Sequence, residues 1–382
     1  MNDDQAFVEK VKARIERQKN IGDMGFSPLS DKFAEGANVK AMWLSQYLSD
    51  RKSRVLDKDR LYSFLSNHRI STPHLFDRYC GALLGLAIGD ALGTTLEFEP
   101  RDAQHISNIV GGGPFNLTAG WWTDDTSMAC CLAYSLIKCG GFDASHLMEC
   151  FSKWYLYGAY SPTGTCFDIG ATTKAALDSF LKRGNPYAGN DDPQAAGNGS
   201  LMRLAPVALY YSQDFEQLIH YASESSRVTH AAQEAIDACR YFSCLLYGAL
   251  RGEPKDILLA ENYAPVPGYW QANPLSPAVA KIAGGSYKVK SRAEIKSTGY
   301  VIDTLEAALW AFHHTNDFRS ALIEAVNLGG DADTVGAVCG QISGAFYGET
   351  EIPIEWIVTI HGMQGFYHFA MDIMNVQSEH RS

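Results

Sequence analysis

Apolar residues recur with helical spacing through most of the chain from Phe76 onward. In residues 80–91 and 301–312 they are three or four positions apart, which places them on one face of a helix. The same spacing is present in residues 128–135 and in residues 335–346. Alternating patterns typical of strands are scarce. The pattern therefore predicts an all-α fold.

Small residues are concentrated in two of these helical segments. They are GALLGLAIGDALG, at residues 81–93, and GAVCGQISGAFYG, at residues 336–348. Small side chains let helix axes approach closely, which favours a compact helical bundle over a coiled coil. Residues 251–298 are rich in Pro and Gly, and we expect them to include a long connection.

The first 75 residues differ from the remainder in their pattern. Helical spacing in residues 5–19 and 39–66 is separated by residues 20–38, which have the Gly, Pro and Ser density of an irregular segment. The sequence therefore predicts an N-terminal extension over residues 1–75 and one domain over residues 76–382.

Composition and charge exclude several classes of protein. A chain of 382 residues with 46% hydrophobic residues can bury a full core. The formal charge of −11 gives no overall field that would attract nucleic acid or an anionic membrane. Residues 1–75 carry 13 Lys and Arg against 10 Asp and Glu, so the excess of acid lies in the domain. Nine cysteines without a CxxC pair, and a charged N-terminus, indicate a cytoplasmic protein with reduced thiols.

Two acidic motifs lie about two hundred residues apart, each at the predicted start of a helix. One is WWTDDTSMACCLAYSL, at residues 121–136, and the other is NLGGDADTVGAVCG, at residues 327–340. Asp or Thr before a helix is ordinarily an N-cap, which needs one side-chain oxygen. These motifs together offer four carboxylates, and four gathered anions repel one another unless cations hold them.

The ligand types in these motifs indicate which cation would bind. Oxygen ligands without His or Cys favour Mg²⁺ or Mn²⁺ over zinc. Two such ions about 3.5–4 Å apart, bridged by a carboxylate, are the usual arrangement for this many oxygen atoms. We therefore expect two Mg²⁺ or Mn²⁺ ions.

Seven ordered motifs between residues 76 and 370 resemble those of the ADP-ribosylglycohydrolase family, which is typified by the enzyme that removes ADP-ribose from an arginine of dinitrogenase reductase. They are GALLGLAIGDALGTTLEFEP, WTDDTSMA, GTCFDIGATTKAAL, GNGSLMRLAPVAL, TH at residues 229–230, GYVIDTLEAALWAF and GGDADTVGAVCGQISGAFYG. The resemblance implies an all-α domain, a binuclear Mg²⁺ or Mn²⁺ centre and hydrolysis of ADP-ribose from a modified protein.

The resemblance also implies a role for particular residues. It assigns to the metal ions Thr123, Asp124, Asp125, Asp331, Asp333 and Thr334. Glu97 would lie on a mobile segment over the metals as a ligand or as a base, although a Glu after a helix is ordinarily solvated surface. Asp168 would protonate the leaving group or hold the guanidinium. Its alternative is an N-cap for a helix that begins at Ile169 or Gly170.

A Gly-containing loop would form the ADP-ribose cleft. The resemblance assigns to this cleft Asn198, Gly199, Ser200 and Met202. Taken alone, Asn-Gly is first a turn signal. His230 would lie near the ligand, with a core or capping histidine as the alternative, and Phe167 or Tyr211 would stack on adenine.

These implications lead to one main hypothesis and two alternatives. The protein would hydrolyse the N-glycosidic bond between ADP-ribose and a modified protein arginine, through a transition state with oxocarbenium character. It could act as an immunity protein, with residues 1–75 binding a cognate ADP-ribosyltransferase toxin; otherwise these residues pack on their own domain. The first alternative is a protein that acts mainly by occluding the transferase. The second is a hydrolase of serine-linked or small-molecule ADP-ribose.

Overall fold

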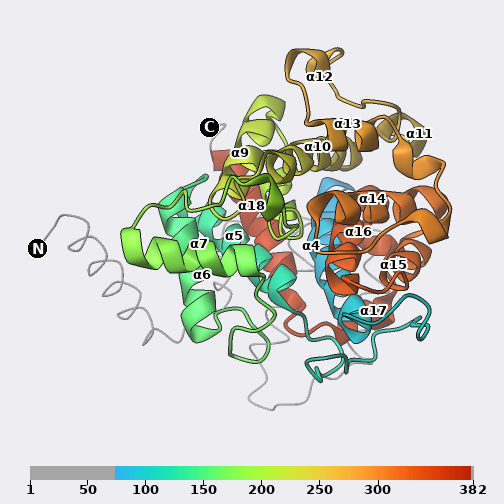
Figure 1. Cartoon of the computed structure of the whole chain (residues 1–382), viewed down its shortest axis with the longest axis horizontal. Coiled ribbons are helices and arrows are strands. Elements are labelled where there is room, and N and C mark those ends of the chain that lie inside the picture. The colour runs from blue at the N-terminus through green and yellow to red at the C-terminus, as the bar shows by residue number, and fades with distance from the viewer. Residues whose placement is uncertain (1–73, 380–382) are drawn as a thin grey trace, which may run out of the picture.

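The structure, a computed structural model, describes residues 74–379 and is all-α over that range (Figure 1). In place of a sheet, these residues form three isolated β-bridges, Gly112 to Leu117, Asn190 to His230 and Gly197 to Tyr300. The longer helices are α4 (His74–Gly93), α5 (Asp124–Cys139), α6 (Ala144–Tyr157), α7 (Ala171–Arg183), α9 (Phe215–Arg227), α10 (Gln233–Leu250), α14 (Val301–His314), α15 (Phe318–Val326), α16 (Ala332–Tyr347) and α18 (Gln364–Glu379). The shorter helices are α8 (Ala205–Tyr210), α11 (Lys255–Leu258), α12 (Tyr269–Ala272), α13 (Pro277–Ala283) and α17 (Ile354–Thr359). The 3₁₀ turns are η2 (Thr94–Leu96), η3 (Pro193–Ala195), η4 (Ser286–Lys288), η5 (Arg292–Glu294) and η6 (Glu349–Glu351).

The two helices rich in small residues, α4 and α16, pack directly against each other at the centre of the fold (Figure 1). Their backbones are in contact along the seam. A Cβ atom on Gly85 would lie 2.2 Å from the carbonyl oxygen of Gly340, and one on Gly89 would lie 2.0 Å from that of Gly336. No side chain fits at such distances, so glycine is required for this approach. The seam places the C-terminal end of α4 beside the N-terminal end of α16.

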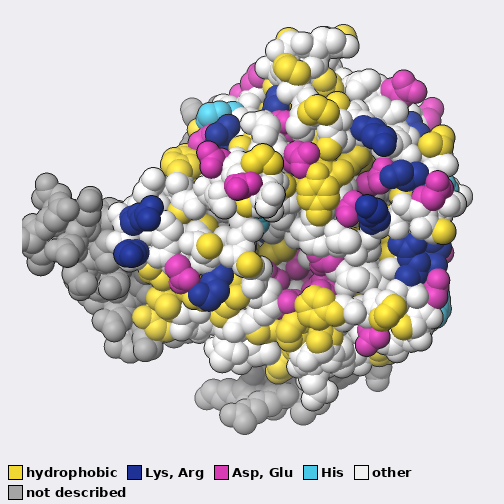
Figure 2. Space-filling view, viewed as in Figure 1, with side chains coloured by type: hydrophobic (Ala, Val, Ile, Leu, Met, Phe, Trp, Pro, Cys, Tyr) yellow, Lys and Arg dark blue, Asp and Glu magenta, His cyan; other side chains and the backbone are white. Residues whose placement is uncertain are grey.

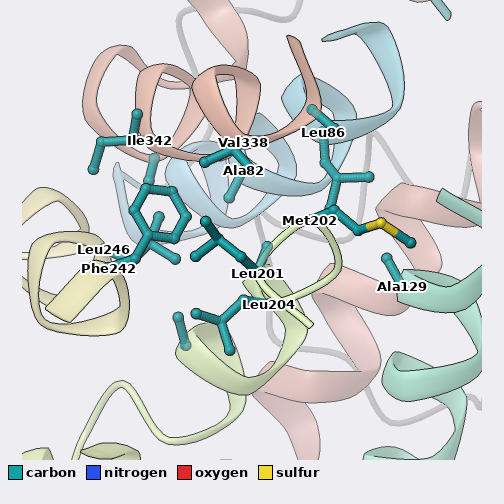
Figure 3. Packing of buried hydrophobic residues seen from close by; sticks show 14 of the residues in the cluster. Ala82, Leu86, Ala129, Leu201, Met202, Leu204, Phe242, Leu246, Val338 and Ile342 are labelled. Atoms are coloured by element: carbon teal, nitrogen blue, oxygen red, sulfur yellow. The ribbon is translucent and has the colours of Figure 1, made fainter. Parts of the chain in front are cut away.

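An apolar core surrounds this seam. Figure 3 shows side chains of α5, α10 and the segment before α8 converging on α4 and α16; those labelled are Ala82, Leu86, Ala129, Leu201, Met202, Leu204, Phe242, Leu246, Val338 and Ile342. Among the described residues, 74–96 form the one helical stretch that is long and apolar enough to cross a membrane, and its apolar window of 18 residues is buried within the fold. It is the central helix of this core.

The four helical segments predicted from apolar spacing are confirmed as α4, α5, α14 and α16. Short helices α11, α12 and α13 interrupt the connection expected over residues 251–298. Helix α4 begins at His74, two residues before the predicted boundary. Apart from its last two residues, the extension predicted over residues 1–75, with its proposed partner, lies outside the described residues.

Candidate active site

A cavity of about 610 Å³ opens where α5, α7 and α16 begin. Figure 2 shows acidic side chains in a hollow of this face, with hydrophobic side chains on its border. Ten of the thirteen residues predicted for the site line the cavity: Glu97, Asp124, Asp168, Asn198, Gly199, Met202, His230, Asp331, Asp333 and Thr334. The fold therefore brings together motifs that are more than two hundred residues apart in sequence.

The start of α5 is capped by a carboxylate from another helix. Thr123 occupies the N-cap position, but its side chain makes no capping hydrogen bond. Instead, the Asp90 carboxylate of α4 accepts hydrogen bonds from the backbone N–H groups of Thr123, at 2.8 Å, and Thr126, at 3.0 Å. Asp90 also accepts from both threonine hydroxyls, and it is fully buried. Asp90 thus satisfies two N–H groups at the start of this helix, in place of Asp124 or Asp125.

The start of α16 is capped in the same way. Asp331 occupies the N-cap position without a capping hydrogen bond from its side chain. Glu97 Oε2 accepts a hydrogen bond from the backbone N–H of Ala332 at 3.0 Å. The backbone N–H of Phe98 donates to the Gly330 carbonyl at 2.7 Å, which fixes the segment that carries Glu97. Gly330 has a φ of +67°, a conformation that glycine adopts without strain.

Two predicted alternatives are therefore wrong. The Thr123 and Asp331 side chains are not N-caps, because Asp90 and Glu97 take that role. Glu97 is also not a solvated surface residue, since it is buried against α16. Asp90 and Glu97 thus supply capping oxygens at both helix starts, while Asp333 Oδ1 accepts a hydrogen bond from the backbone N–H of Thr334 at 2.8 Å.

Three carboxylates crowd around a single hydroxyl group. Thr123 Oγ1 lies 3.0 Å from Asp90 Oδ1, 3.3 Å from Asp125 Oδ2 and 3.1 Å from Asp333 Oδ2. A hydroxyl has one proton to donate, so it cannot satisfy three carboxylates. Asp125 Oδ1 is buried and has no hydrogen-bond partner. An unpaired buried carboxylate oxygen is costly unless a proton or a cation balances it.

Burial and mutual repulsion raise the pKa values of this cluster. Burial, followed by the charge of Asp333, raises the pKa of Asp331 to about 7 and that of Asp90 to about 7. Burial also raises the pKa of Asp124 well above its usual range, with Asp168 the next cause, and that of Asp125, with Asp333 the next cause. Each carboxyl thus resists ionisation because its neighbours are also acidic and water is excluded.

The donor set fits a hard divalent cation. Carboxylate oxygens of Glu97, Asp331 and Asp333 lie within 4.8 Å of one another and could hold a metal ion. Asp125 adds the unpaired oxygen described above, and Asp124 lines the same cavity. All of these ligand atoms are oxygen, as Mg²⁺ and Mn²⁺ prefer. We refer to Glu97, Asp124, Asp125, Asp331 and Asp333 as the acidic wall.

Asp168 stands at the edge of the acidic wall in a strained conformation. Its φ of +57° is unusual for a residue with a side chain. The following helix begins at Ala171 with Gly170 at the N-cap, so the prediction that Asp168 caps a helix from Ile169 or Gly170 is wrong. Burial, with the neighbouring Asp333 carboxylate, raises the pKa of Asp168 to about 9. Strain and a raised pKa in a cavity are typical of functional residues.

The opposite side of the cavity, formed by residues 197–199, Met202 and His230, is here called the loop wall. Asn198 joins three segments: its backbone N–H donates to the Gly299 carbonyl, and its side-chain amide donates to Thr304 Oγ1 at 2.8 Å and to Asp331 Oδ2 at 2.7 Å. The amide is therefore the direct link between the two walls.

Beneath the loop wall lies Arg203, a fully buried cation. Its guanidinium donates to the Gly199 carbonyl and to Thr229 Oγ1, both at 2.7 Å. Thr229 Oγ1 also lies 2.8 Å from Nδ1 of His230. Burial, with the charge of Arg203, lowers the pKa of His230 to about 3, so this imidazole is neutral at physiological pH.

Three predicted site residues and one predicted aromatic contact lie elsewhere. Thr123 and Asp125 are fully buried and do not line the cavity. Ser200 lies behind the loop wall, where its hydroxyl accepts a hydrogen bond from Ser226 at 2.8 Å. Tyr211, expected to stack on adenine, stacks on Tyr221 in a second cavity. Tyr211 therefore does not reach the candidate site.

Sequence reasoning missed Asp90 and Arg203 as members of this site. Both stand inside motifs that were recognised as motifs, GDALG and SLMRL. The available signal was a charged residue within an otherwise apolar helical segment, which is rarely buried without partners. Asp90 positions the start of α5, and Arg203 positions the loop wall.

Comparison with known proteins decides the family. A family model described as ADP-ribosylglycohydrolase matches residues 71–382. The chain belongs to this family. A solved member, described as an ADP-ribosylglycohydrolase-related protein complex, superposes with a TM-score of 0.70 at 40% identity, covering 79% of this chain and 99% of its own. The all-α fold of the ADP-ribosylglycohydrolases is thereby confirmed.

Curated relatives place the chain more closely within the family. ADP-ribosylarginine hydrolase Tri1 of Pseudomonas putida (strain GB-1) is 46% identical over 299 residues, covering 78% of each chain. Tri1 of Serratia proteamaculans (strain 568) is 44% identical over 281 residues, 74% of each chain. The ADP-ribosyl-[dinitrogen reductase] glycohydrolase of Rhodospirillum rubrum is 32% identical over 293 residues, covering 75% of this chain and 90% of its own.

Proposed function

We propose that this ADP-ribosylglycohydrolase hydrolyses the N-glycosidic bond between ADP-ribose and an arginine side chain of a modified protein. The single observation that carries the proposal is the acidic wall, whose carboxylates gather at the starts of α5 and α16 beside a cavity that a Gly-containing loop also lines. Relatives named as ADP-ribosylarginine hydrolases, at 44% and 46% identity, support arginine as the acceptor.

We further propose that two Mg²⁺ or Mn²⁺ ions bind the acidic wall, with hydroxyl oxygens of Thr123 and Thr334 completing the set. The unpaired Asp125 Oδ1 and the crowding at Thr123 support this proposal. Bound divalent ions would supply charge balance and would orient ribose hydroxyls and water. The protein residues carry out the remaining steps.

Asp168 is the proposed proton donor to the leaving group. Guanidine leaves readily only when it is protonated, and burial, the first cause of the raised pKa of the Asp168 carboxyl, favours the protonated form that can donate. Glu97 is the proposed proton acceptor for the attacking water. Its Oε2 is held by the N-terminus of α16, so the carboxylate keeps a fixed orientation over the acidic wall.

The loop wall would hold the pyrophosphate and ribose of the substrate. Gly199 brings the backbone close to the cavity, because a Cβ there would lie 2.8 Å from His230 Cε1. Loops of this kind let backbone N–H groups approach phosphate oxygens. The neutral His230 keeps one ring nitrogen for a hydrogen bond in the cavity, as donor or acceptor according to the tautomer that Thr229 sets at Nδ1.

An immunity role against an ADP-ribosyltransferase toxin is proposed on the similarity to the Tri1 proteins. The proposed partners are the ADP-ribosylated protein and, through residues 1–75, the toxin itself. We propose that the protein acts in the cytoplasm. Deleting residues 1–70 is expected to abolish toxin binding and to spare hydrolysis, which separates an occluding protein from an enzyme.

Release of ADP-ribose from ADP-ribosyl-arginine, measured with Mg²⁺ and with EDTA, tests the enzymatic proposal. We expect release with Mg²⁺, none with EDTA, and a loss of at least about a thousandfold for Asp331→Ala, because several kcal/mol of transition-state stabilisation depend on the metal ligands. The exposed Asp178→Ala serves as a control with full activity. If the protein releases ADP-ribose only from a serine-linked substrate, the alternative hypothesis of a serine-directed hydrolase is favoured instead.

A further inference from the structure

Phe98, which lines the cavity beside Glu97, is the first of three phenylalanines in successive ring contact. We call Phe98, Phe115 and Phe167 the aromatic rim. The rings of Phe98 and Phe115 meet edge to face at 6.4 Å between centroids, and those of Phe115 and Phe167 lie 5.2 Å apart. Hydrophobic side chains border the acidic hollow in Figure 2 as well.

Phe98 is held in a costly position. Its side chain is 68% exposed, and its φ is +62°, a conformation that aromatic residues rarely adopt. Exposure of a large apolar ring and backbone strain both lower stability, so they need a compensating role. The backbone bond from Phe98 N–H to Gly330 holds the ring at the cavity that it lines.

The other two rings are also fixed by local structure. Phe115 lies in a turn closed by two backbone bonds between Gly112 and Leu117, at 2.8 and 2.9 Å. Thr95 Oγ1 ties the Gly111 carbonyl of this turn to η2 at 3.0 Å, just before Glu97. Phe167 directly precedes Asp168. Two of the three rings are thus next in sequence to a proposed catalytic carboxyl.

This placement determines what passes over the rim. The bond to be cleaved must lie at Glu97 and Asp168, and ADP-ribose extends from there along the loop wall. The arginine on the other side of the bond must leave through the mouth at the acidic end. The protein chain that carries this arginine therefore crosses Phe98 and its neighbours.

We propose that the aromatic rim is the recognition surface for the modified protein and binds an apolar side chain next to the ADP-ribosylated arginine. This inference rests on the proposed function and adds a substrate preference to it. Exposed aromatic rings in a fixed cluster are typical binding hot spots, since they bury large apolar areas without losing much rotamer freedom.

Three substrates test the proposal with the full chain and Mg²⁺: free ADP-ribosyl-arginine, a peptide with one ADP-ribosyl-arginine flanked by leucines, and the same peptide flanked by serines. We expect the native protein to show a kcat/KM about tenfold higher for the leucine peptide than for the serine peptide, mainly through KM. Phe98→Asn should reduce this ratio to below about twofold, because Asn tolerates the left-handed backbone and lacks the ring.

Further variants separate recognition from folding and from chemistry. Phe98→Tyr keeps the ring and should keep the preference, whereas Phe115→Ala should weaken it. Val289→Ala, at a valine that is 87% exposed and does not line the cavity, should leave it unchanged. Thermal unfolding midpoints report whether each variant is folded.

The outcomes distinguish this inference from the function on which it rests. The aromatic rim is not a recognition surface if the native protein treats both peptides alike, if Phe98→Asn and Phe115→Ala both retain the preference, or if Phe98→Asn slows all three substrates equally. Failure of the native protein to release ADP-ribose even from free ADP-ribosyl-arginine would overturn the proposed function itself.

Discussion

Cationic and amide donors hold the loop wall, whereas the acidic wall gathers carboxylates around few donors. Asn198 and Arg203 donate to carbonyl, hydroxyl and carboxylate oxygens at 2.7–2.8 Å. Across the cavity, Asp125 Oδ1 has no partner, and three carboxylates share the Thr123 hydroxyl. The loop wall rests on a cation of its own, Arg203, whose Nε is the one buried guanidinium nitrogen left without a hydrogen-bond partner among the described residues, whereas the acidic wall needs a cation from outside. Binding of metal is therefore coupled to stability at one wall only.

Removing one acidic ligand should have the largest effect on hydrolysis, and it should show that stability depends on metal at the acidic wall. Asp125→Asn is expected to lower hydrolysis by about a thousandfold, or about 4 kcal/mol in the transition state. In EDTA at pH 8 the same variant should be more stable than the native protein by at least about 1 kcal/mol, because the cost of burying an acidic group is removed. Urea unfolding with EDTA and with Mg²⁺ measures both effects.

Asp178→Asn is the matched control, because Asp178 is an exposed carboxylate on α7. It should change neither activity nor the response of stability to Mg²⁺. A metal-free Asp125→Asn protein that is less stable than the native protein would show that the acidic wall is not under electrostatic strain.

Changing the loop wall should instead lower stability by the same amount with and without metal. Arg203→Met keeps much of the apolar volume but leaves the Gly199 carbonyl and the Thr229 hydroxyl without their donor. We expect a loss of about 3 kcal/mol in the free energy of unfolding, since buried polar groups without partners are costly. Urea unfolding in EDTA and in Mg²⁺ measures this loss. A loss seen only with metal would contradict the contrast between the walls.

The smallest expected effect is in the pH dependence of the metal-free protein. The pKa values of Asp90 and Asp331 are raised to about 7, and that of Asp168 to about 9, first by burial. The folded state therefore binds more protons than the unfolded state, so this contribution to stability is full below about pH 4 and is lost as pH rises through 7 to 9.

We expect the free energy of unfolding in EDTA to fall by about 1 kcal/mol or more between pH 5 and pH 8. Saturating Mg²⁺ should reverse or flatten this fall, because cation binding favours the ionised carboxylates. Asp331→Asn should reduce it without metal. Stability that rises over the same pH range in EDTA would contradict the direction of these pKa shifts.

Local patterns were sufficient to predict the helices and most of the cavity lining. The spacing of apolar residues defined α4, α5, α14 and α16, because each must bury one face. The order of the motifs identified the residues that meet at the cavity. The family resemblance implies which distant segments lie close together, and a single sequence does not show this by itself. Seven motifs therefore predicted a site that no single segment reveals.

The remainder depends on contacts between distant segments. Asp90 and Glu97 accept hydrogen bonds from the backbone of helix starts 33 and 235 residues later in the chain, and helix-start statistics assign that role to neighbouring residues instead. The positive φ of Asp168 and Phe98 likewise comes from the surrounding fold rather than from residue preference. Ser200 was predicted to line the cleft because it belongs to the GNGS loop at residues 197–200. A loop of four residues points only some of its side chains into a cavity, and that of Ser200 points away from it.

The close seam between α4 and α16 has a consequence beyond packing. It sets the distance between the two helices. Asp90 in α4 and Glu97 just after η2 reach the starts of α5 and α16 because the backbones touch at Gly85 and Gly340. A methyl group added at Gly85 would separate α4 from α16 and move the Asp90 and Glu97 carboxylates away from the helix starts that they cap. Such a change would disable the catalytic centre from within the core, although every metal ligand would still be present in the sequence. Substitutions that alter substrate preference are therefore tolerated at the aromatic rim but not at the seam between α4 and α16.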